Sequence, residues 1–151
     1  KLNNRARAIE VIKIPKNKTE QSNNKSISIP ILGKIAAGNP IEAISDNTNY
    51  IDIPKSHLGK GEYFLLEVEG NSMINAGIFD GDQVIIEKCN DAKNGEIVVA
   101  LIDNNEATLK RIYKRGQQLA LQPENSAFKT VIYGPDRVQI QGILKQLIRK
   151  Y

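Results

Sequence analysis

Short apolar segments of strand length recur along most of the chain, separated by residues that favour turns. The clearest of these segments are residues 63–68, 83–87, 96–102, 107–113, 118–122 and 138–144. Asp, Asn and Gly gather between them at 80–82, 103–105 and 115–116, which is typical turn chemistry. No segment carries a long apolar stripe with the 3.6-residue period of a helix. The sequence therefore predicts a mostly β domain, built as a partly open barrel.

The first 25 residues hold seven lysines and arginines against two glutamates, a net charge of +5, whereas the whole chain has a net charge of +4. The rest of the chain therefore carries a net charge of −1. A domain that binds DNA with its body is expected to have a basic face, and this body lacks the charge for one. Residues 15–26 are rich in Pro, Lys, Asn, Gln and Ser, a composition typical of a solvated linker.

Cysteine and histidine are too scarce for the usual metal sites. With one cysteine, Cys89, and one histidine, His57, we expect neither an internal disulfide nor a zinc site. No acidic cluster has the spacing of a calcium-binding loop. No apolar run approaches the ~18 to 20 residues that a membrane span needs. We therefore expect a cytoplasmic protein without a metal, a cofactor or a membrane contact.

A candidate nucleophile follows the apolar segment 63–68, in the stretch Gly70-Asn71-Ser72-Met73. A serine on a glycine-containing turn exposes its hydroxyl together with backbone N–H groups that can hold an oxyanion. A loop serine is more often structural, so Ser72 needs a base nearby to become a catalytic candidate. His57 lies in a polar stretch that offers nothing in favour of a Ser-His-Asp triad.

Lysine is then the remaining common partner for a catalytic serine. A lysine base must be neutral near pH 7, so burial must lower its pKa from about 10.4 by roughly three. Lys110 lies in the middle of segment 107–113, on the same face as Thr108 and Ile112 by the two-residue period of a strand. A surface-facing lysine fits the same pattern. The sequence pattern is therefore compatible with a catalytic Ser72–Lys110 pair but does not distinguish it from an exposed lysine.

Several segments resemble LexA-type repressors, and they occur in the same order. They are residues 4–9 (NRARAI), 30–40 (PILGKIAAGNP), 70–73 (GNSM), 80–82 (DGD), 96–100 (EIVVA), 108–111 (TLKR) and 121–126 (LQPENS). The spacing of 38 positions between Ser72 and Lys110 is also similar to that family. This resemblance covers nearly the whole chain.

The resemblance implies a self-cleaving serine peptidase of the LexA type. Ser72 would be the nucleophile, Lys110 the general base, and the backbone N–H groups of Asn71 and Ser72 the oxyanion hole. The bond that is cut would be Ala37–Gly38, in a flexible cleavage segment at 33–42.

The same resemblance divides the chain into three parts. Residues 1–14 would be the end of a winged helix-turn-helix domain, residues 15–26 a linker, and residues 27–151 the Ser-Lys autopeptidase and dimerisation domain. The chain would form a homodimer and would contact operator DNA only through the missing amino-terminal domain. A RecA filament on single-stranded DNA would stimulate self-cleavage and so relieve repression of the SOS response to DNA damage.

Other functions share parts of this pattern. A UmuD-like polymerase accessory protein and a phage CI-type repressor use the same self-cleavage chemistry, but residues 4–9 and the Ala37–Gly38 bond favour LexA. A signal peptidase shares a Ser-Met and lysine chemistry and would need a membrane anchor. A dimerisation module without catalysis is the alternative of a different class, because residues 143–148 form an apolar strand that could pair across a two-fold axis.

Overall fold

The computed structural model describes residues 25–35 and 49–151, which fall into two compact units. The smaller unit includes residues 50–60 and the start of strand β1 (Ser26–Ile35). Most of strand β2 (Asn49–Pro54) and the 3-10 turn η1 (Lys55–His57) also belong to it. Ser28 Oγ donates a hydrogen bond to Asp52 Oδ1 at 2.7 Å inside this unit. The predicted parts 1–14 and 15–26 lie outside the described residues, apart from Lys25 and Ser26.

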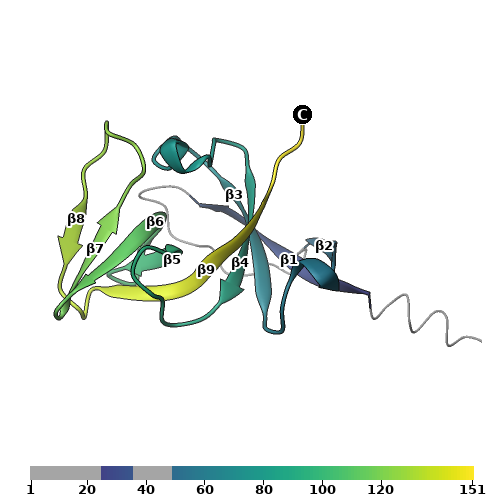
Figure 1. The fold of residues 1–151 in the computed structure, drawn as a ribbon, viewed down its shortest axis with the longest axis horizontal. Coiled ribbons are helices and arrows are strands. Elements are labelled where there is room, and N and C mark those ends of the chain that lie inside the picture. Colours follow the sequence, from purple (N-terminus) through teal and green to yellow (C-terminus); the bar gives the residue numbers. More distant parts are fainter. Residues whose placement is uncertain (1–24, 36–48) are drawn as a thin grey trace, which may run out of the picture. The chain divides into compact units, whose positions relative to one another are not determined.

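The larger unit contains one sheet, whose strands follow the order β1-β3-β4-β9-β5-β6-β7-β8 (Figure 1). Its strands are the end of β1, β3 (Tyr63–Val68), β4 (Gln83–Lys88), β5 (Ile97–Ile102), β6 (Glu106–Arg115), β7 (Gln118–Gln122), β8 (Val131–Tyr133) and β9 (Val138–Ile148). β1 runs parallel to β3, and the pairs that follow are antiparallel. The order ends at β8, so the sheet is open. The expectation of a mostly β, incompletely closed fold is confirmed.

The strand boundaries agree closely with the hydrophobic pattern. β3 and β7 have the predicted bounds, whereas β6 and β9 extend beyond their apolar segments. The strands β1, β2 and β8 are absent from the clearest predicted segments. In β1 the reason is Pro30, because a proline inside a strand removes a backbone donor and weakens the sequence signal.

Two clusters of buried side chains form the core of the larger unit. Alternate residues of β5 belong to different clusters: Val99 to the first, and Val98 and Ala100 to the second. This alternation follows from the strand period of two, which sends successive side chains to opposite faces of the sheet. Met73 and Ile78, from the loop after β3, belong to the first cluster and are each 2% exposed. That loop is therefore anchored in the core.

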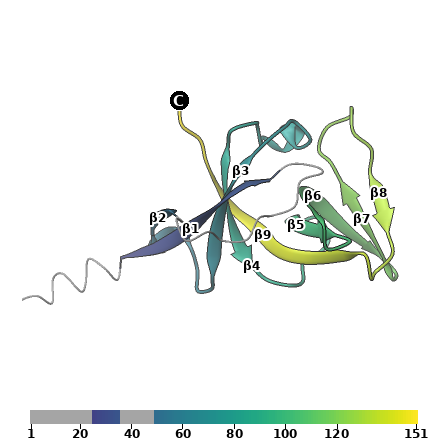
Figure 2. The same ribbon diagram turned by 180° about the vertical axis from the view of Figure 1, so that it is seen from behind.

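The long strand β9 pairs with two neighbours in succession. Its first part pairs with β5 as far as Ile143, and its second part pairs with β4 from Gly142 onward. Figure 1 and, from behind, Figure 2 show β9 running from the β5 side of the sheet to the β4 side. Gly142 lies where the two pairings meet, facing both Lys88 and Val99. The crossing brings the chain's last residues to the loop between β3 and β4.

Candidate active site

The loop between β3 and β4 carries Ser72 and is closed at its base by backbone hydrogen bonds. Val68 N donates to Asp82 O at 2.8 Å, and Gly81 N donates to Val68 O at 2.7 Å. Gly70 has a φ of 93°, a backbone conformation that favours glycine, and its N–H donates to Asp80 Oδ1 at 2.8 Å. The loop therefore begins with a sharp turn just before Ser72.

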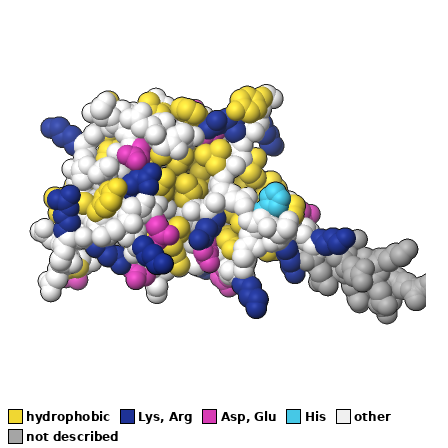
Figure 3. Space-filling view, in the orientation of Figure 1, with side chains coloured by type: hydrophobic (Ala, Val, Ile, Leu, Met, Phe, Trp, Pro, Cys, Tyr) yellow, Lys and Arg dark blue, Asp and Glu magenta, His cyan; other side chains and the backbone are white. Residues whose placement is uncertain are grey.

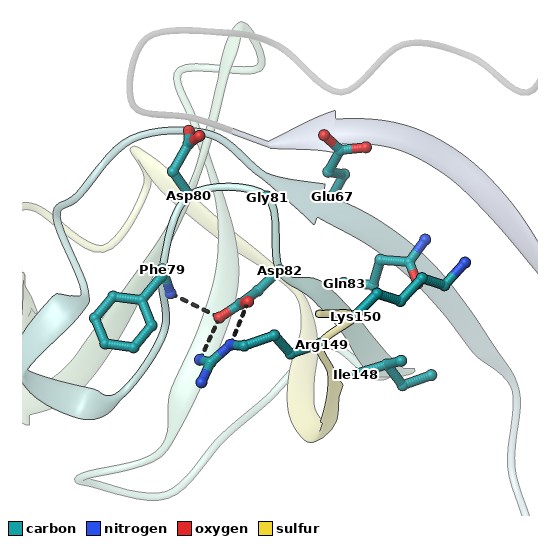
Figure 4. Close-up of a pocket in the computed structure, with 9 residues that line it drawn as sticks. All are labelled: Glu67, Phe79, Asp80, Gly81, Asp82, Gln83, Ile148, Arg149 and Lys150. Carbon is teal, nitrogen blue, oxygen red and sulfur yellow. Dashed lines mark hydrogen bonds and ion pairs between the residues drawn. The ribbon is translucent and has the colours of Figure 1, made fainter.

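An ion pair between a buried carboxylate and a partly exposed arginine ties the end of this loop to the residue that follows β9 (Figure 4). Arg149 Nε lies 2.8 Å from Asp82 Oδ1, and Arg149 Nη2 lies 2.7 Å from Asp82 Oδ2. Phe79 N also donates to Asp82 Oδ2, at 2.7 Å, and the guanidinium lies 4.7 Å from the centroid of the Phe79 ring. Asp82 is 2% exposed, and the hydrogen bonds from Arg149 lower its pKa. The Asp82 carboxylate thus joins the residue before β4 to the residue after β9.

Lys110 reaches Ser72 from β6. Its Nζ lies 3.3 Å from Ser72 Oγ, although the two residues are 38 positions apart. The same nitrogen donates to Thr108 Oγ1 at 2.5 Å and to the carbonyl of Leu109 at 3.2 Å. Thr108 shares the Lys110 face of β6 and is 5% exposed, so it fixes the direction of the amine. The two residues that the sequence proposed as a pair therefore lie in contact.

Burial changes the acid-base properties of this lysine. Loss of solvent around the amine lowers the pKa of Lys110 from 10.5 to about 8, and the negative charge of Glu106 opposes that shift. At pH 7 about a tenth of Lys110 is then neutral, compared with less than about one part in a thousand for an exposed lysine. A neutral amine within hydrogen-bond reach of a serine hydroxyl can accept its proton.

A cavity of about 200 Å³ opens beside the lysine. Its walls come from β5, β6, β7 and β8 and from the segment between β7 and β8, and they include Glu106, Lys110, Phe128 and Val131. Phe128 and Val131 are each 45% exposed, so the cavity has an apolar rim.

Comparison with known proteins shows to which family the chain is similar. The Peptidase S24-like family matches residues 30–145. A LexA repressor from Rhodospirillum rubrum is 58% identical over 127 residues, which cover 84% of this chain and 51% of that protein. A LexA repressor from Paramagnetospirillum magneticum is 42% identical over 180 residues, covering all of this chain and 77% of that protein.

The chain belongs to the LexA branch of the S24 peptidase family. It spans about half the length of the Rhodospirillum rubrum repressor and about three quarters of the second one. The matched S24 region contains every strand from β3 to β8, and therefore both Ser72 and Lys110. The family resemblance drawn from the short motifs is confirmed.

The predicted cleavage site falls in a part of the chain that the structure does not describe. Ala37 and Gly38 lie outside the described residues, as does most of the cleavage segment 33–42. Within residues 25–35 and 49–151, no group of His, Cys, Asp and Glu side chains could hold a metal ion. None of the helices in that part of the chain has the length and apolar character needed to cross a membrane.

Sequence reasoning gave no individual role to Glu124 or Asn125, although both lie in the motif at 121–126. Glu124 N donates to Ser72 O at 2.8 Å, and Asn125 Nδ2 donates to Asn71 O at 2.7 Å. The position of a Pro-Glu-Asn sequence directly after a strand was the available signal. Pattern alone could not show which loop of the S24 domain these residues contact.

Proposed function

We propose that this chain is the self-cleaving part of a LexA-type repressor, and that it cuts its own Ala37–Gly38 bond. The observation that carries the proposal is the 3.3 Å contact between Ser72 Oγ and a partly buried lysine amine with a pKa of about 8. Membership of the S24 peptidase family supports the reaction class. The repressor activity of the whole protein is inferred from its LexA relatives.

The proposed reaction uses the serine and the lysine in turn. Neutral Lys110 takes the hydroxyl proton while Ser72 Oγ bonds to the carbonyl carbon of Ala37. The backbone N–H groups of Asn71 and Ser72 hold the resulting oxyanion. The bond to Gly38 then breaks, and Lys110 passes its proton to the leaving amine. Water hydrolyses the ester on Ser72, with Lys110 again acting as the base.

The path of the chain before residue 36 supports attack within one molecule. The end of β1 and the end of β3 are parallel neighbours, with Ile35 paired to Val68. Glu69 N donates to Ile35 O at 2.9 Å, only three residues before Ser72. In the sequence, Ala37 follows Ile35 by only two residues. A tethered substrate needs no diffusional encounter, which favours a fast intramolecular reaction.

Incubation of the purified chain at pH 10 tests this proposal. Lys110 is then almost fully neutral, so we expect two fragments, one ending at Ala37 and one starting at Gly38. Mass spectrometry of the products identifies the bond. An intact chain, or a cut at another bond, would contradict the proposed function.

Glu106 provides a test of how the lysine is tuned. Because its negative charge raises the pKa of Lys110, the isosteric change Glu106→Gln should lower that pKa and speed self-cleavage at pH 7 about twofold. At pH 10 both proteins hold a neutral lysine, and their rates should converge. The measurement is the cleavage rate from pH 6 to 10; a half-maximal pH that stays constant or rises would exclude this role for Glu106.

At the level of the whole repressor, we propose that self-cleavage ends repression of DNA-damage genes. Operator binding would belong to a segment outside residues 27–151, because the remainder after residue 25 has a net charge of −1. A RecA filament would act by binding the cleavage-competent form more tightly than the resting form. Only such a difference in affinity can shift the balance between two conformations.

Self-association of the same domain is a second proposed role. β9 carries partly buried apolar side chains on both faces of the sheet: Leu144 and Leu147 pack against the first core cluster, and Ile143 packs against the second. Figure 3 shows hydrophobic side chains gathered on the face that β9 crosses in Figure 1. A homodimer that buries this face would agree with the LexA relatives. If the chain stays intact at pH 10, dimerisation without catalysis becomes the better function.

A further inference from the structure

The segment after β7 is hydrogen-bonded at two points to the loop that carries Ser72. Glu124 N donates to the Ser72 carbonyl at 2.8 Å, and Asn75 N donates to the Glu124 carbonyl at 2.7 Å. The two hydrogen bonds run in opposite directions, as between paired strands. They hold one peptide unit on each side of Glu124 against the loop that carries the serine. The backbone of Ser72 therefore cannot move independently of Glu124.

The side chain of Glu124 makes a third connection, to β6. Arg111 Nε lies 2.8 Å from Glu124 Oε1, and Arg111 Nη1 also donates to the carbonyl of Gly95. The Arg111 and Glu124 side chains are only 25% and 24% exposed, so the pair is partly shielded from water. Arg111 directly follows Lys110. Glu124 thus links the backbone of Ser72 to the strand position next to the lysine.

Asn125 adds a connection of the same kind. Its Nδ2 donates to the Asn71 carbonyl at 2.7 Å, and its Oδ1 accepts a hydrogen bond from Ala127 N at 2.9 Å. The second bond orients the amide, so that the first can hold the residue before Ser72. Two consecutive residues of one segment therefore bind two consecutive residues of the loop.

We propose that Glu124 is a positioning residue for self-cleavage, which sets the separation between Ser72 Oγ and Lys110 Nζ. This inference rests on the proposed function. The Ser72–Lys110 contact of 3.3 Å is at the long end for a hydrogen bond, so a small displacement breaks it. Successive residues of a strand point to opposite faces, so the Arg111–Glu124 pair holds β6 from the side away from the amine. Glu124 acts on geometry and takes no proton.

The test compares self-cleavage of the full chain with that of Glu124→Ala, Glu124→Gln and Arg111→Ala from pH 6 to 10.5. We expect Glu124→Ala to lower the plateau rate at high pH about 10- to 100-fold, the range expected for a displacement of about 1 Å. The pH of half-maximal rate should stay where it is in the original chain. Glu124→Gln keeps an acceptor for Arg111 and should give an intermediate rate.

Arg111→Ala should lower the plateau rate at least as much as Glu124→Ala, because it also removes the hydrogen bond to the Gly95 carbonyl. The double variant should be no slower than Arg111→Ala, because the link between Arg111 and Glu124 is then already lost. The matched control is Asp103→Asn. It removes the carboxylate charge from a different arginine–carboxylate pair, in which Arg137 Nη2 lies 2.6 Å from Asp103 Oδ2, and should leave the rate unchanged. Thermal unfolding of each variant gives the temperature below which all are folded, and rates are compared there.

The outcomes separate this inference from the proposed function. If the original chain stays intact at pH 10, both are overturned. If the original chain is cut and Glu124→Ala is cut equally fast, only the positioning role is wrong. A plateau that is fully restored at high pH, with a shifted midpoint, would also overturn it, because Glu124 would then act on protonation. If Glu124→Ala does not fold, Glu124→Gln decides the question by the same criteria.

Discussion

Replacing Ser72 by alanine is expected to abolish self-cleavage at every pH, because the nucleophilic oxygen is removed. Lys110→Met should do the same, since a thioether cannot accept the serine proton. Lys110→Arg should also be inactive, because a guanidinium stays protonated throughout the accessible pH range. Gel electrophoresis and mass spectrometry after incubation from pH 6 to 10.5 measure the loss.

The original chain supplies the reference curve. Its rate should rise with pH, reach half its maximum near the Lys110 pKa of about 8, and then level off. Below that pH the amine is protonated and cannot act as a base. Cleavage that persists in Ser72→Ala, or that continues at high pH in Lys110→Met, would assign the chemistry to other residues.

The lysine change should also alter stability, in a direction that depends on pH. Lys110 has a pKa of about 8 in the folded chain and 10.5 as its ordinary value, so between these pH values the unfolded chain binds more protons. The free energy of unfolding of the original chain therefore rises across that window. At pH 7 Lys110→Met should be more stable by up to about 3 kcal/mol, and the gain should shrink by pH 10.5. Urea unfolding in the Ser72→Ala background measures both values.

Gly142→Ala is expected to destabilise the fold on the order of 3 kcal/mol, the upper end for overpacking a core. A Cβ at this position would lie 2.4 Å from Ile86 Cγ2 and 2.6 Å from the carbonyl oxygen of Glu87. The second of these contacts is with the backbone of the neighbouring strand β4, which cannot rotate away. Gly142 also lies where β9 changes partner, so a shift there would strain both pairings.

Gly134→Ala is the matched control for this prediction. A Cβ at Gly134 meets no atom within 4 Å, so the change should be neutral or slightly stabilising, by about 0.5 kcal/mol. Both variants are compared by urea unfolding in the Ser72→Ala background, which removes cleavage as a complication. Equal midpoints for Gly142→Ala and its parent would mean that β4 and β9 separate to accept the methyl group.

Most of the fold was accessible from local sequence, and the reason lies in the strand period. In β3 and β7 apolar segments end at turn residues, so the predicted bounds coincide with the observed ones. Where the local sequence signal is weak, a strand is missed or its predicted bounds are too short. Pro30 obscures β1, and the outer residues of β6 are polar.

The candidate site was only partly accessible. Ser72 and Lys110 could be named because each residue type and local setting permits catalysis. Arg111, Glu124 and Arg149 could not be given roles, because their partners lie at positions that no local pattern connects. Arg149 and Asp82, for example, are 67 positions apart.

The sequence by itself determined a mostly β chain of LexA-like character, with one serine and one lysine suited to peptide-bond cleavage. Strand alternation, turn residues and ordered motifs are local properties, so they can be recognised in the amino-acid sequence alone. Only the tertiary structure decided that Lys110 is buried enough for a pKa of about 8 and lies 3.3 Å from Ser72. Burial and separation depend on the strand order β3-β4-β9-β5-β6, which long-range packing sets.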